Sequence, residues 1–524
     1  MVSFWKNKSA DEGQAAEGEE EQQASQPRAT TVRAEREPLL GEHRPATHLT
    51  ADDPAVEISP YNLFVVRSLR RVSIFLLMIS LAWWVICLVS TFIAIPGLIT
   101  RGSSFTQLSY ASISIANLLI SLIFFVTPSQ GERVASFTLS FLLFVDAIII
   151  VAVTRLRYEE SWVGIATVLW AAAIGAWTVM SDRVVEAAKK SEEERLVGRA
   201  ETRRTLTEWL SVFSSFILFL VLIVAIVLMT LTLIMRAVDS GLEAPGDRFL
   251  VESDNYAIHI YCVGDSGKSD VTVLVEAGET SAEVFSTWVT EAQREGLVGR
   301  VCITDRPGFG WSDNAPSPLS AGRATDALSE ALIEAEEKGP WVLVSHGVGG
   351  IYSRIFASRH TAAVQGILLV DTMHEDLFDR VANARNGFFL WVRGFVSPLG
   401  ITQVFGWVFG GRSIEDRVVG RAAWRSGRWI KAKFQESLAG MATANEVSAA
   451  RAILPRDVPL SVVSSGKVSR RDAAWRNAQK DLTTITDRLL SFDEVKYASH
   501  NVWEDNEGRA ILKKRLAEVY RTGR

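Results

Sequence analysis

The chain of 524 residues is long enough for about three domains of roughly 150 residues each. Its formal net charge of −5 gives no sign of a nucleic-acid partner, and its three cysteines are too few for a disulfide framework. Apolar residues make up 48% of the chain and concentrate between about residues 72 and 236, which indicates a membrane region.

Residues 1–60 are rich in Glu, Gln, Ala and Ser and contain few large apolar side chains. Such a segment cannot bury enough surface to offset its ordering entropy, so we predict a disordered acidic tail. It lacks the features of a secretory signal and of a mitochondrial presequence. Within it, Glu35–Leu40 resembles an acidic di-leucine sorting signal, which implies cytosolic sorting adaptors as partners. A chance match in a Glu-rich tail is the alternative.

Five apolar segments follow, and each is close to the ~20 residues that a helix needs to cross a bilayer. They run over residues 72–99, 105–126, 134–153, 162–180 and 209–235. Short polar turns separate them, and tryptophans lie near several ends, as expected at a membrane surface. We therefore predict an all-α transmembrane bundle of about five spans within residues 61–240.

The positive charges beside these segments predict their orientation, because cytosolic loops carry an excess of Lys and Arg. One face of the predicted bundle has eleven Lys and Arg residues, and the other has four. The N-terminus is therefore predicted to be cytosolic. An odd number of spans then places the C-terminal part outside the cytosol, in an endomembrane such as that of the vacuole or the endoplasmic reticulum. If the Ala- and Gly-rich fourth segment does not cross, the C-terminal part becomes cytosolic.

One carboxylate lies in the middle of a predicted span, at Asp146. A charge in lipid is costly, so such a residue is a functional candidate by default. The alternative that we favour is a buried carboxyl that bonds a Ser or Thr of a neighbouring helix. Ala171 and Gly175, four residues apart in the fourth segment, predict close packing between helices.

Residues 246–524 are predicted to form one large domain. Strands are expected at 257–263, 271–276, 300–304, 341–345, 366–370, 460–464 and 494–498, and helical patterns lie between most of them. This alternation predicts a mostly parallel sheet with helices on both faces. Cys262 and Cys302 fall on two of these strands, so a disulfide between them requires the strands to be neighbours.

Five short motifs follow one another along this domain. They are Leu274–Glu279, Asp305–Asp313, Ser345–Gly349, Gly366–Asp371 and Ala498–His500. Together they resemble the α/β-hydrolase fold family, in the branch of haloalkane dehalogenases, epoxide hydrolases, lipases and esterases. The combination with about five membrane helices also resembles a family of fungal integral membrane proteins. The resemblance implies an α/β-hydrolase domain of lipid- or ester-hydrolase ancestry.

The resemblance also implies a base and an orienting acid. His500 matches the position of the base. The acid has two candidates, Asp472 after the strand at 460–464 and Asp371 at the end of the preceding strand. An N-cap of the following helix is an equal alternative for Asp472.

The oxyanion loop is represented by Gly278, Glu279 and Val348, whose backbone N–H groups are the candidates to hold a negative oxygen. The carboxylate of Glu279 would oppose such chemistry unless it points away. The elbow departs from the Gly-x-Ser-x-Gly pattern, because its nucleophile position is Gly347. Losing a triad nucleophile typically costs ~10⁶ in turnover. Ser345 should point along the strand, so water activated by His500 is the other route.

A cap is predicted over residues 373–455, and its stretch 388–434 combines aromatic side chains with interleaved Arg and Lys. This composition suits contact with a lipid interface, whereas a basic-faced helix pair packed on the core is the alternative.

We therefore predict a polytopic membrane protein whose hydrolase-like domain is catalytically impaired and acts in ligand binding or regulation. Its expected partners are membrane lipids and a lipid or ester-like small molecule, with no nucleic acid, metal or cofactor. The alternatives are an active membrane-bound lipid or ester hydrolase that uses an unconventional route, and a membrane scaffold or sorting protein.

Overall fold

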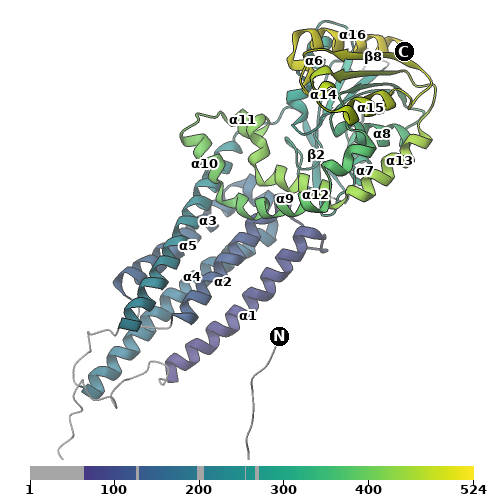
Figure 1. Cartoon of the computed structure of the whole chain (residues 1–524). Helices are drawn as coiled ribbons and strands as arrows, with labels where there is room; N and C mark the ends of the chain where they lie inside the picture. Colours follow the sequence, from purple (N-terminus) through teal and green to yellow (C-terminus); the bar gives the residue numbers. More distant parts are fainter. Residues whose placement is uncertain (1–63, 125–128, 198–205, 254, 266–270, 524) are drawn as a thin grey trace, which may run out of the picture.

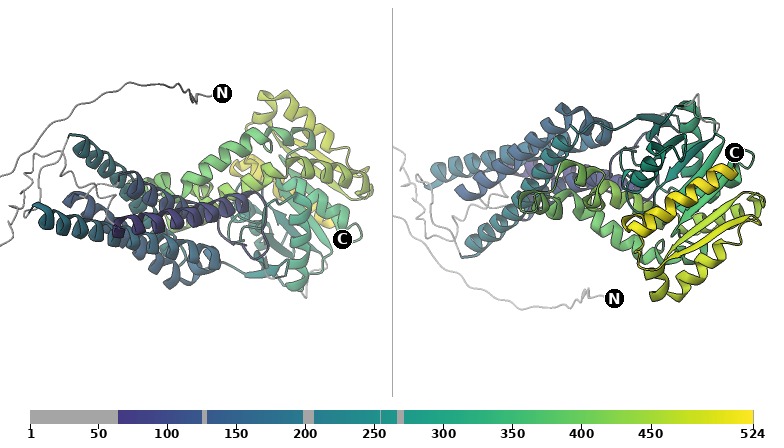
Figure 2. Two further views of the ribbon diagram at one scale, coloured as in Figure 1. Left: turned by 90° about the horizontal axis from the view of Figure 1, so that it is seen from below. Right: turned by 90° about the horizontal axis from the view of Figure 1, so that it is seen from above.

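A computed structural model describes residues 64–124, 129–197, 206–253, 255–265 and 271–523. The predicted tail and its Glu35–Leu40 motif lie outside these residues. Figure 1 shows a helical bundle at one end, an α/β domain at the other, and the helices of the cap between them. The bundle and the α/β domain stay at opposite ends in the two views of Figure 2.

Five helices of the described part are long and apolar enough to cross a membrane. They lie within α1 (Phe64–Phe92), α2 (Phe105–Ile123), α3 (Gln130–Ala152), α4 (Thr154–Val197) and α5 (Leu206–Asp239). The first was predicted to reach residue 99 but ends at Phe92, because Pro96 and Gly97 in the apolar stretch that follows do not continue a helix. A break at Ser161, where φ is 55°, divides α4 into a short polar part and the apolar span.

Asp146 is buried in the bundle and has two hydroxyl partners. Its carboxylate accepts hydrogen bonds from Tyr110 on α2 at 2.8 Å and from Thr230 on α5 at 2.7 Å. The structure therefore gives Asp146 the hydrogen-bonded role that we favoured. Gly175 on α4 packs against Ser140 on α3, as expected of a small residue between close helices.

One sheet of eight strands forms the centre of the C-terminal domain, in the order β1-β2-β4-β3-β5-β6-β7-β8. The strands from β4 to β8 in this order are parallel, whereas β1 and β2 are antiparallel to their neighbours. Their bounds are β1 Asp247–Val251, β2 Tyr256–Val263, β3 Thr272–Glu276, β4 Arg300–Thr304, β5 Trp341–His346, β6 Val364–Val370, β7 Leu460–Ser465 and β8 Leu489–Val495. The predicted fold class is confirmed.

Two edge strands differ from the prediction. β1 was not predicted, and the last strand covers Leu489–Val495 rather than residues 494–498. Both strands lie at the edges of the sheet and are mostly half-buried, so their sequences lack the continuous apolar run of a buried parallel strand. Cys262 on β2 and Cys302 on β4 lie directly opposite each other and form a disulfide.

Helices cover both faces of the sheet, as expected for parallel strands that are buried on each side. On one face, α6 (Ala282–Arg294) and α16 (Asn506–Thr522) contribute a core around Trp288 and Leu512. On the other, α7 (Ala321–Glu334), α8 (Gly349–Arg359) and α15 (Ala473–Leu482) pack around Ile351 and Leu482.

The cap lies between β6 and β7. It consists of η3 (Glu375–Arg380), α9 (Ala384–Val396), η4 (Ser397–Leu399), α10 (Ile401–Val408), α11 (Ile414–Val418), η5 (Arg421–Arg425), α12 (Gly427–Leu438) and α13 (Gly440–Ile453). Figure 1 shows α9, α10 and α12 at the junction with the bundle. There, Lys431 of α12 donates to the Thr91 carbonyl of α1 at 2.6 Å.

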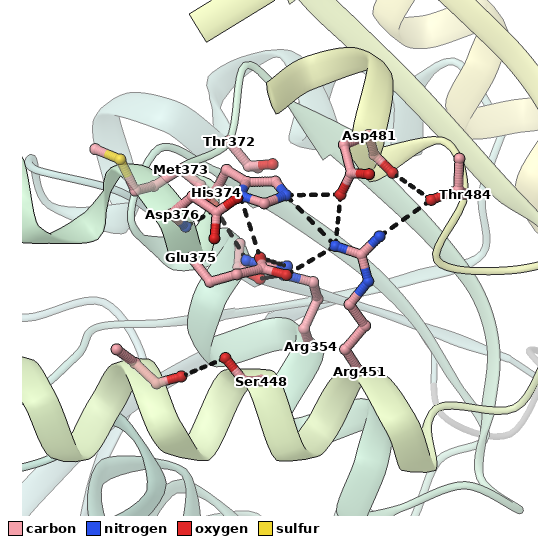
Figure 3. Close-up of polar contacts among 12 residues, drawn as sticks. Arg354, Thr372, Met373, His374, Glu375, Asp376, Ser448, Arg451, Asp481 and Thr484 are labelled. Atoms are coloured by element: carbon pink, nitrogen blue, oxygen red, sulfur yellow. Dashed lines mark hydrogen bonds and ion pairs between the residues drawn. The ribbon is translucent and has the colours of Figure 1, made fainter. Parts of the chain in front are cut away.

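A charged cluster ties the cap to the sheet (Figure 3). Arg354 of α8 is almost fully buried and pairs with Glu375, which Arg451 of α13 also contacts at 2.9 Å. Arg451 and His374 both contact Asp481 of α15. The cluster therefore fixes the segment after β6 between the elbow helix α8, the end of the cap and α15.

Candidate functional site

Gly347 occupies the tip of a tight turn between β5 and α8. Its φ of +53° lies in the left-handed region, where a residue other than glycine would be strained by about 1–3 kcal/mol. Its carbonyl accepts a hydrogen bond from the Met373 N–H at 2.8 Å, which joins the turn to the segment after β6. The backbone therefore has the shape of a nucleophile elbow, although no side chain leaves it.

Asp371 and His500 form the acid–base pair of the site. His500 Nδ1 lies 2.7 Å from Asp371 Oδ2. Asp371 is fully buried, and its other oxygen accepts hydrogen bonds from the Ser465 N–H at 3.0 Å and from Trp475 Nε1 at 2.9 Å. Asp371 itself has a φ of +45°, which is unusual for a residue with a side chain. Two parallel strands and α15 thus aim this carboxylate at the histidine.

Asp472 does not take part in this pair. Its carboxylate caps the N-terminus of α15 by accepting hydrogen bonds from the N–H groups of Ala474 and Trp475, and it forms an ion pair with Arg380. The candidate acid at position 472 is therefore corrected to the N-cap alternative, and Asp371 is the carboxylate that orients His500.

Glu279 fills the space that the absent nucleophile leaves. A Cβ atom added to Gly347 would lie 2.7 Å from Glu279 Oε2, and that same oxygen lies 3.6 Å from His500 Nε2. The loop that carries it is firmly held, because Trp429 Nε1 of the cap donates to the Glu279 carbonyl at 2.8 Å. The carboxylate points toward the site rather than away from it.

The Asp305–Asp313 motif stabilises the loop that carries Glu279. Asp305 accepts hydrogen bonds from the Ala282 N–H at 3.0 Å and from the Trp311 N–H at 3.1 Å. Arg306 donates to the Gly278 carbonyl and pairs with Glu436 of α12. The motif therefore positions the oxyanion loop and contributes no reacting group.

The charges of the site favour a protonated histidine. Burial alone would lower the pKa of His500, but its contacts with Asp371 and Glu279 outweigh burial and raise that pKa to about 10. Burial alone would raise the pKa of Glu279, but His500 and the nearby Lys433 hold it well below its usual range. At neutral pH the site therefore contains an imidazolium between two carboxylates.

His346, next to the elbow glycine, stays neutral. Burial and the neighbouring positive charge of His500 lower its pKa to about 3. Its ring packs against those of Phe285, Trp503 and His500, and its Nε2 atom lies 3.2 Å from the His500 carbonyl. These contacts give His346 a structural role. Ser345 on β5 is fully buried.

The other two candidates for the oxyanion loop lie beside the elbow. A Cβ atom added to Gly278 would come within 3.2 Å of the Gly347 Cα atom, so the loop and the turn are in close contact. Val348 is buried and occupies the N-cap position of α8. Negative charge is favoured at a helix N-terminus, and here the Glu279 carboxylate already lies close to this turn.

Glu279, His346 and His500 each offer one metal-ligand atom within 4.8 Å of the other two. Two histidines and one carboxylate are ligands that zinc accepts. A metal would have to displace the proton of His500, which the two carboxylates stabilise. We expect no metal, and elemental analysis of the purified protein tests this expectation.

A cavity of about 740 Å³ extends from Glu279 to the end of the helical bundle. Its wall includes residues of α2, α4 and α5, the loop at Phe309, and the cap at Trp424 and Trp429. Six arginines line it, namely Arg155, Arg236, Arg248, Arg417, Arg421 and Arg428. Each of these arginines is ion-paired with a carboxylate, and the acidic partners are Glu159, Glu160, Asp239, Asp313 and Glu504. Apolar rings and paired charges of both signs thus share one wall, which suits a molecule with an apolar chain and a polar head.

Comparisons with known proteins agree with this architecture. Residues 34–262 match a region of unknown function, DUF2417, and residues 280–512 match the alpha/beta hydrolase family. An uncharacterized protein of Schizosaccharomyces pombe is 34% identical over 92% of this chain and 95% of its own length. An uncharacterized vacuolar membrane protein of Saccharomyces cerevisiae is 25% identical over 59% of this chain and 58% of its own length.

Among solved structures, a haloalkane dehalogenase variant from Bradyrhizobium elkanii is 15% identical, with a TM-score of 0.40, over 53% of this chain and 96% of its own. A thermophilic esterase from Thermogutta terrifontis is 18% identical, with a TM-score of 0.37, over 52% of this chain and 100% of its own. At these values the two structures say nothing about activity.

The chain is a membrane protein with an α/β-hydrolase domain. It belongs to a family of fungal membrane proteins in which an apolar helical region precedes that domain.

The order of the motifs along the chain pointed to Gly347 and His500 and left the acid open between Asp371 and Asp472, and the structure brings Asp371 to His500. Sequence reasoning missed the position of the Glu279 side chain. The signal was present, since an acidic residue in the oxyanion loop stood out, but the direction of a loop side chain depends on contacts with the cap.

Proposed function

We propose that the α/β domain is a hydrolase-like binding domain, which holds a lipid or ester-like amphiphile from the membrane without hydrolysing it through a serine-type triad. The position of the Glu279 carboxylate carries this proposal. It stands where a nucleophile would stand, and with Asp371 it keeps His500 protonated. A protonated imidazole cannot accept the proton that a base must remove.

The cavity supports binding as the retained function. It reaches from Glu279 to α5, so an amphiphile can place its polar head among the paired charges and its chain along the aromatic rings. The test measures labelling by a photoactivatable fatty acid in nanodiscs. Ala423→Trp places a large side chain in the cavity and should be labelled less than the wild type. Ala449→Trp, on the exposed face of α13, is the matched control. Equal labelling of all three proteins would overturn the proposal.

Loss of serine-type chemistry has its own test. Gly347→Ser alone should gain no esterase activity, because its Cβ would lie 2.7 Å from Glu279 Oε2. The double variant Gly347→Ser, Glu279→Ala removes that overlap and also removes one of the two carboxylates that keep His500 protonated. It should therefore hydrolyse p-nitrophenyl esters. Robust ester hydrolysis by the wild type, abolished by His500→Ala, would contradict catalytic impairment.

A second candidate is a working hydrolase with Glu279 as nucleophile. The carboxylate is one-third exposed, lines the cavity and faces a protonated histidine. With a lipid epoxide, Glu279 would attack carbon while His500 donates its proton to the ring oxygen. The resulting ester is neutral, so the neutral His500 then takes a proton from water, which attacks the ester carbonyl and releases a diol.

Isotope labelling separates the two candidates. In ¹⁸O-water, the second route inserts one water oxygen into the Glu279 carboxylate at each turnover, and mass spectrometry of the peptide detects it. A wild type that binds the epoxide but leaves Glu279 unlabelled supports the binding domain.

We also propose a vacuolar membrane location with a cytosolic N-terminus and a lumenal α/β domain. The name of the yeast relative, the distribution of Lys and Arg, and the Cys262–Cys302 disulfide support this orientation, since disulfides form in oxidising compartments. Sorting adaptors that bind Glu35–Leu40 would deliver the protein. Protease protection of intact vacuoles tests the orientation, and Leu39→Ala with Leu40→Ala tests the sorting motif.

A further inference from the structure

The cap contains a bent helical pair whose outer face is apolar. Residues Ala384–Leu399 and Ile401–Val408 meet at 50° and together are as apolar as a membrane span. Phe388 of α9 is 62% exposed, Phe405 of α10 is 56% exposed, and Phe409, directly after α10, is 79% exposed. Burying such side chains is worth about 1.5–3 kcal/mol each, so water is an unfavourable environment for this face.

The inner side of the pair is fixed to the membrane bundle at two glycines. Gly394 of α9 lies directly against the Phe105 ring at the start of α2. Gly400, at the bend, lies against Thr232 of α5. A side chain at either glycine would overlap these neighbours, so the pair contacts the bundle at backbone distance and its orientation is set.

The contact with α5 gives the position of the pair along the bundle. Thr232 precedes the end of α5 at Asp239 by seven residues, which corresponds to about 10 Å along a helix. In this last part of α5, Ile234 and Val238 are 38% and 49% exposed and face outward as the lipid-facing residues of a span do. The apolar face of α9 and α10 therefore lies at the level of exposed apolar residues of a helix that is apolar enough to cross a membrane.

We propose that α9 and α10 lie within the lipid leaflet on the side of the α/β domain, as an interfacial segment that does not cross the membrane. Because α5 has 34 residues and only ~20 are needed to cross the hydrocarbon core, a contact about 10 Å before its end lies near the boundary of headgroups and acyl chains, where amphipathic helices bind. Arg393 and Arg425 stack on Trp424 at 4.6 Å and 5.0 Å, an aromatic and cationic grouping expected near headgroups.

This placement connects the leaflet to the cavity. Ser397, Pro398 and Gln403, on the inner side of the bend, line the cavity that reaches Glu279. A lipid-derived ligand could therefore pass from the leaflet to the site without crossing water. This consequence rests on the proposed binding function, whereas the immersion of the pair does not.

The experiment measures contact with lipid directly in the full chain in nanodiscs. Cys262 and Cys302 are bonded to each other and Cys87 is buried, so in a Cys87→Ser background an introduced cysteine is the target for an NBD label. The label is placed by Phe405→Cys or Phe409→Cys, and the control is Tyr497→Cys, 67% exposed after β8.

Phospholipids with a doxyl quencher at the fifth acyl carbon should remove most of the fluorescence at positions 405 and 409 and leave that at 497 unchanged. Quenching at 405 and 409 no greater than at 497 would overturn the proposal. Stronger quenching by a doxyl group at the twelfth carbon would also overturn it, because the pair would then lie deeper than an interfacial segment. Neither readout depends on ligand binding, so failure here is distinct from failure of the proposed function.

Discussion

Replacing Glu279 by Gln removes one of the two carboxylates that hold a proton on His500. Opposite charges 3.6 Å apart attract by about 1.2 kcal/mol in bulk water and by about 4.6 kcal/mol at an effective dielectric constant of ~20. Because the two side chains are 35% and 33% exposed, solvent screens the pair, and we expect a loss of about 1.5–3 kcal/mol. The pKa of His500 should therefore fall from about 10 by about 1–2 units in Glu279→Gln.

Titration of the histidine ring by NMR in nanodiscs measures this pKa, with the signal assigned from the spectrum of His500→Gln. Glu504→Gln is the matched control, because Glu504 lines the same cavity but pairs with Arg421. It should leave the titration of His500 unchanged. An unchanged pKa in Glu279→Gln, or a wild-type His500 that is neutral at pH 7, would refute the assignment of Glu279 as its partner.

Three further predictions concern Asp371, the pH dependence of stability and the disulfide. Asp371→Asn should lower the pKa of His500 more than Glu279→Gln does, because the Asp371 carboxylate is fully buried and its Oδ2 atom lies 2.7 Å from His500 Nδ1. Asp472→Asn should leave the pKa of His500 unchanged in the same titration. The folded-state pKa of His500 is raised, so the contribution of its proton to stability is complete below about pH 6.5 and is lost as the pH rises toward about 10. The unfolding temperature of the wild type should therefore fall over this pH range, and it should fall less in His500→Gln. Reduction of the Cys262–Cys302 disulfide, which spans 40 residues, should cost about 4 kcal/mol on the loop-entropy model, seen as a lower unfolding temperature with reductant that Cys262→Ser reproduces. An unfolding temperature insensitive to reductant would contradict the third prediction.

Much of the fold could be predicted because its signals are local. The apolar segments are long, the buried strands are continuous apolar runs, and the motifs around Gly347 and His500 occur in the order that an α/β-hydrolase requires. The edge strands β1 and β8 were missed or misplaced, since an exposed strand leaves a weak pattern. The end of α1 was misplaced because hydropathy does not register where a helix ends.

The sequence by itself determined that the elbow lacks a reacting side chain, because glycine at position 347 has none. It could not choose between Asp371 and Asp472, since both follow strands, and only the packing of β6, β7 and α15 brings Asp371 to His500. Nor could the sequence show that the Glu279 carboxylate takes the place of the nucleophile. The position of that carboxylate depends on Trp429 and Lys433 of α12, about 150 residues further along the chain. Residue identity is a local property, whereas the electric field at His500 is the sum of groups that only the folded chain brings together.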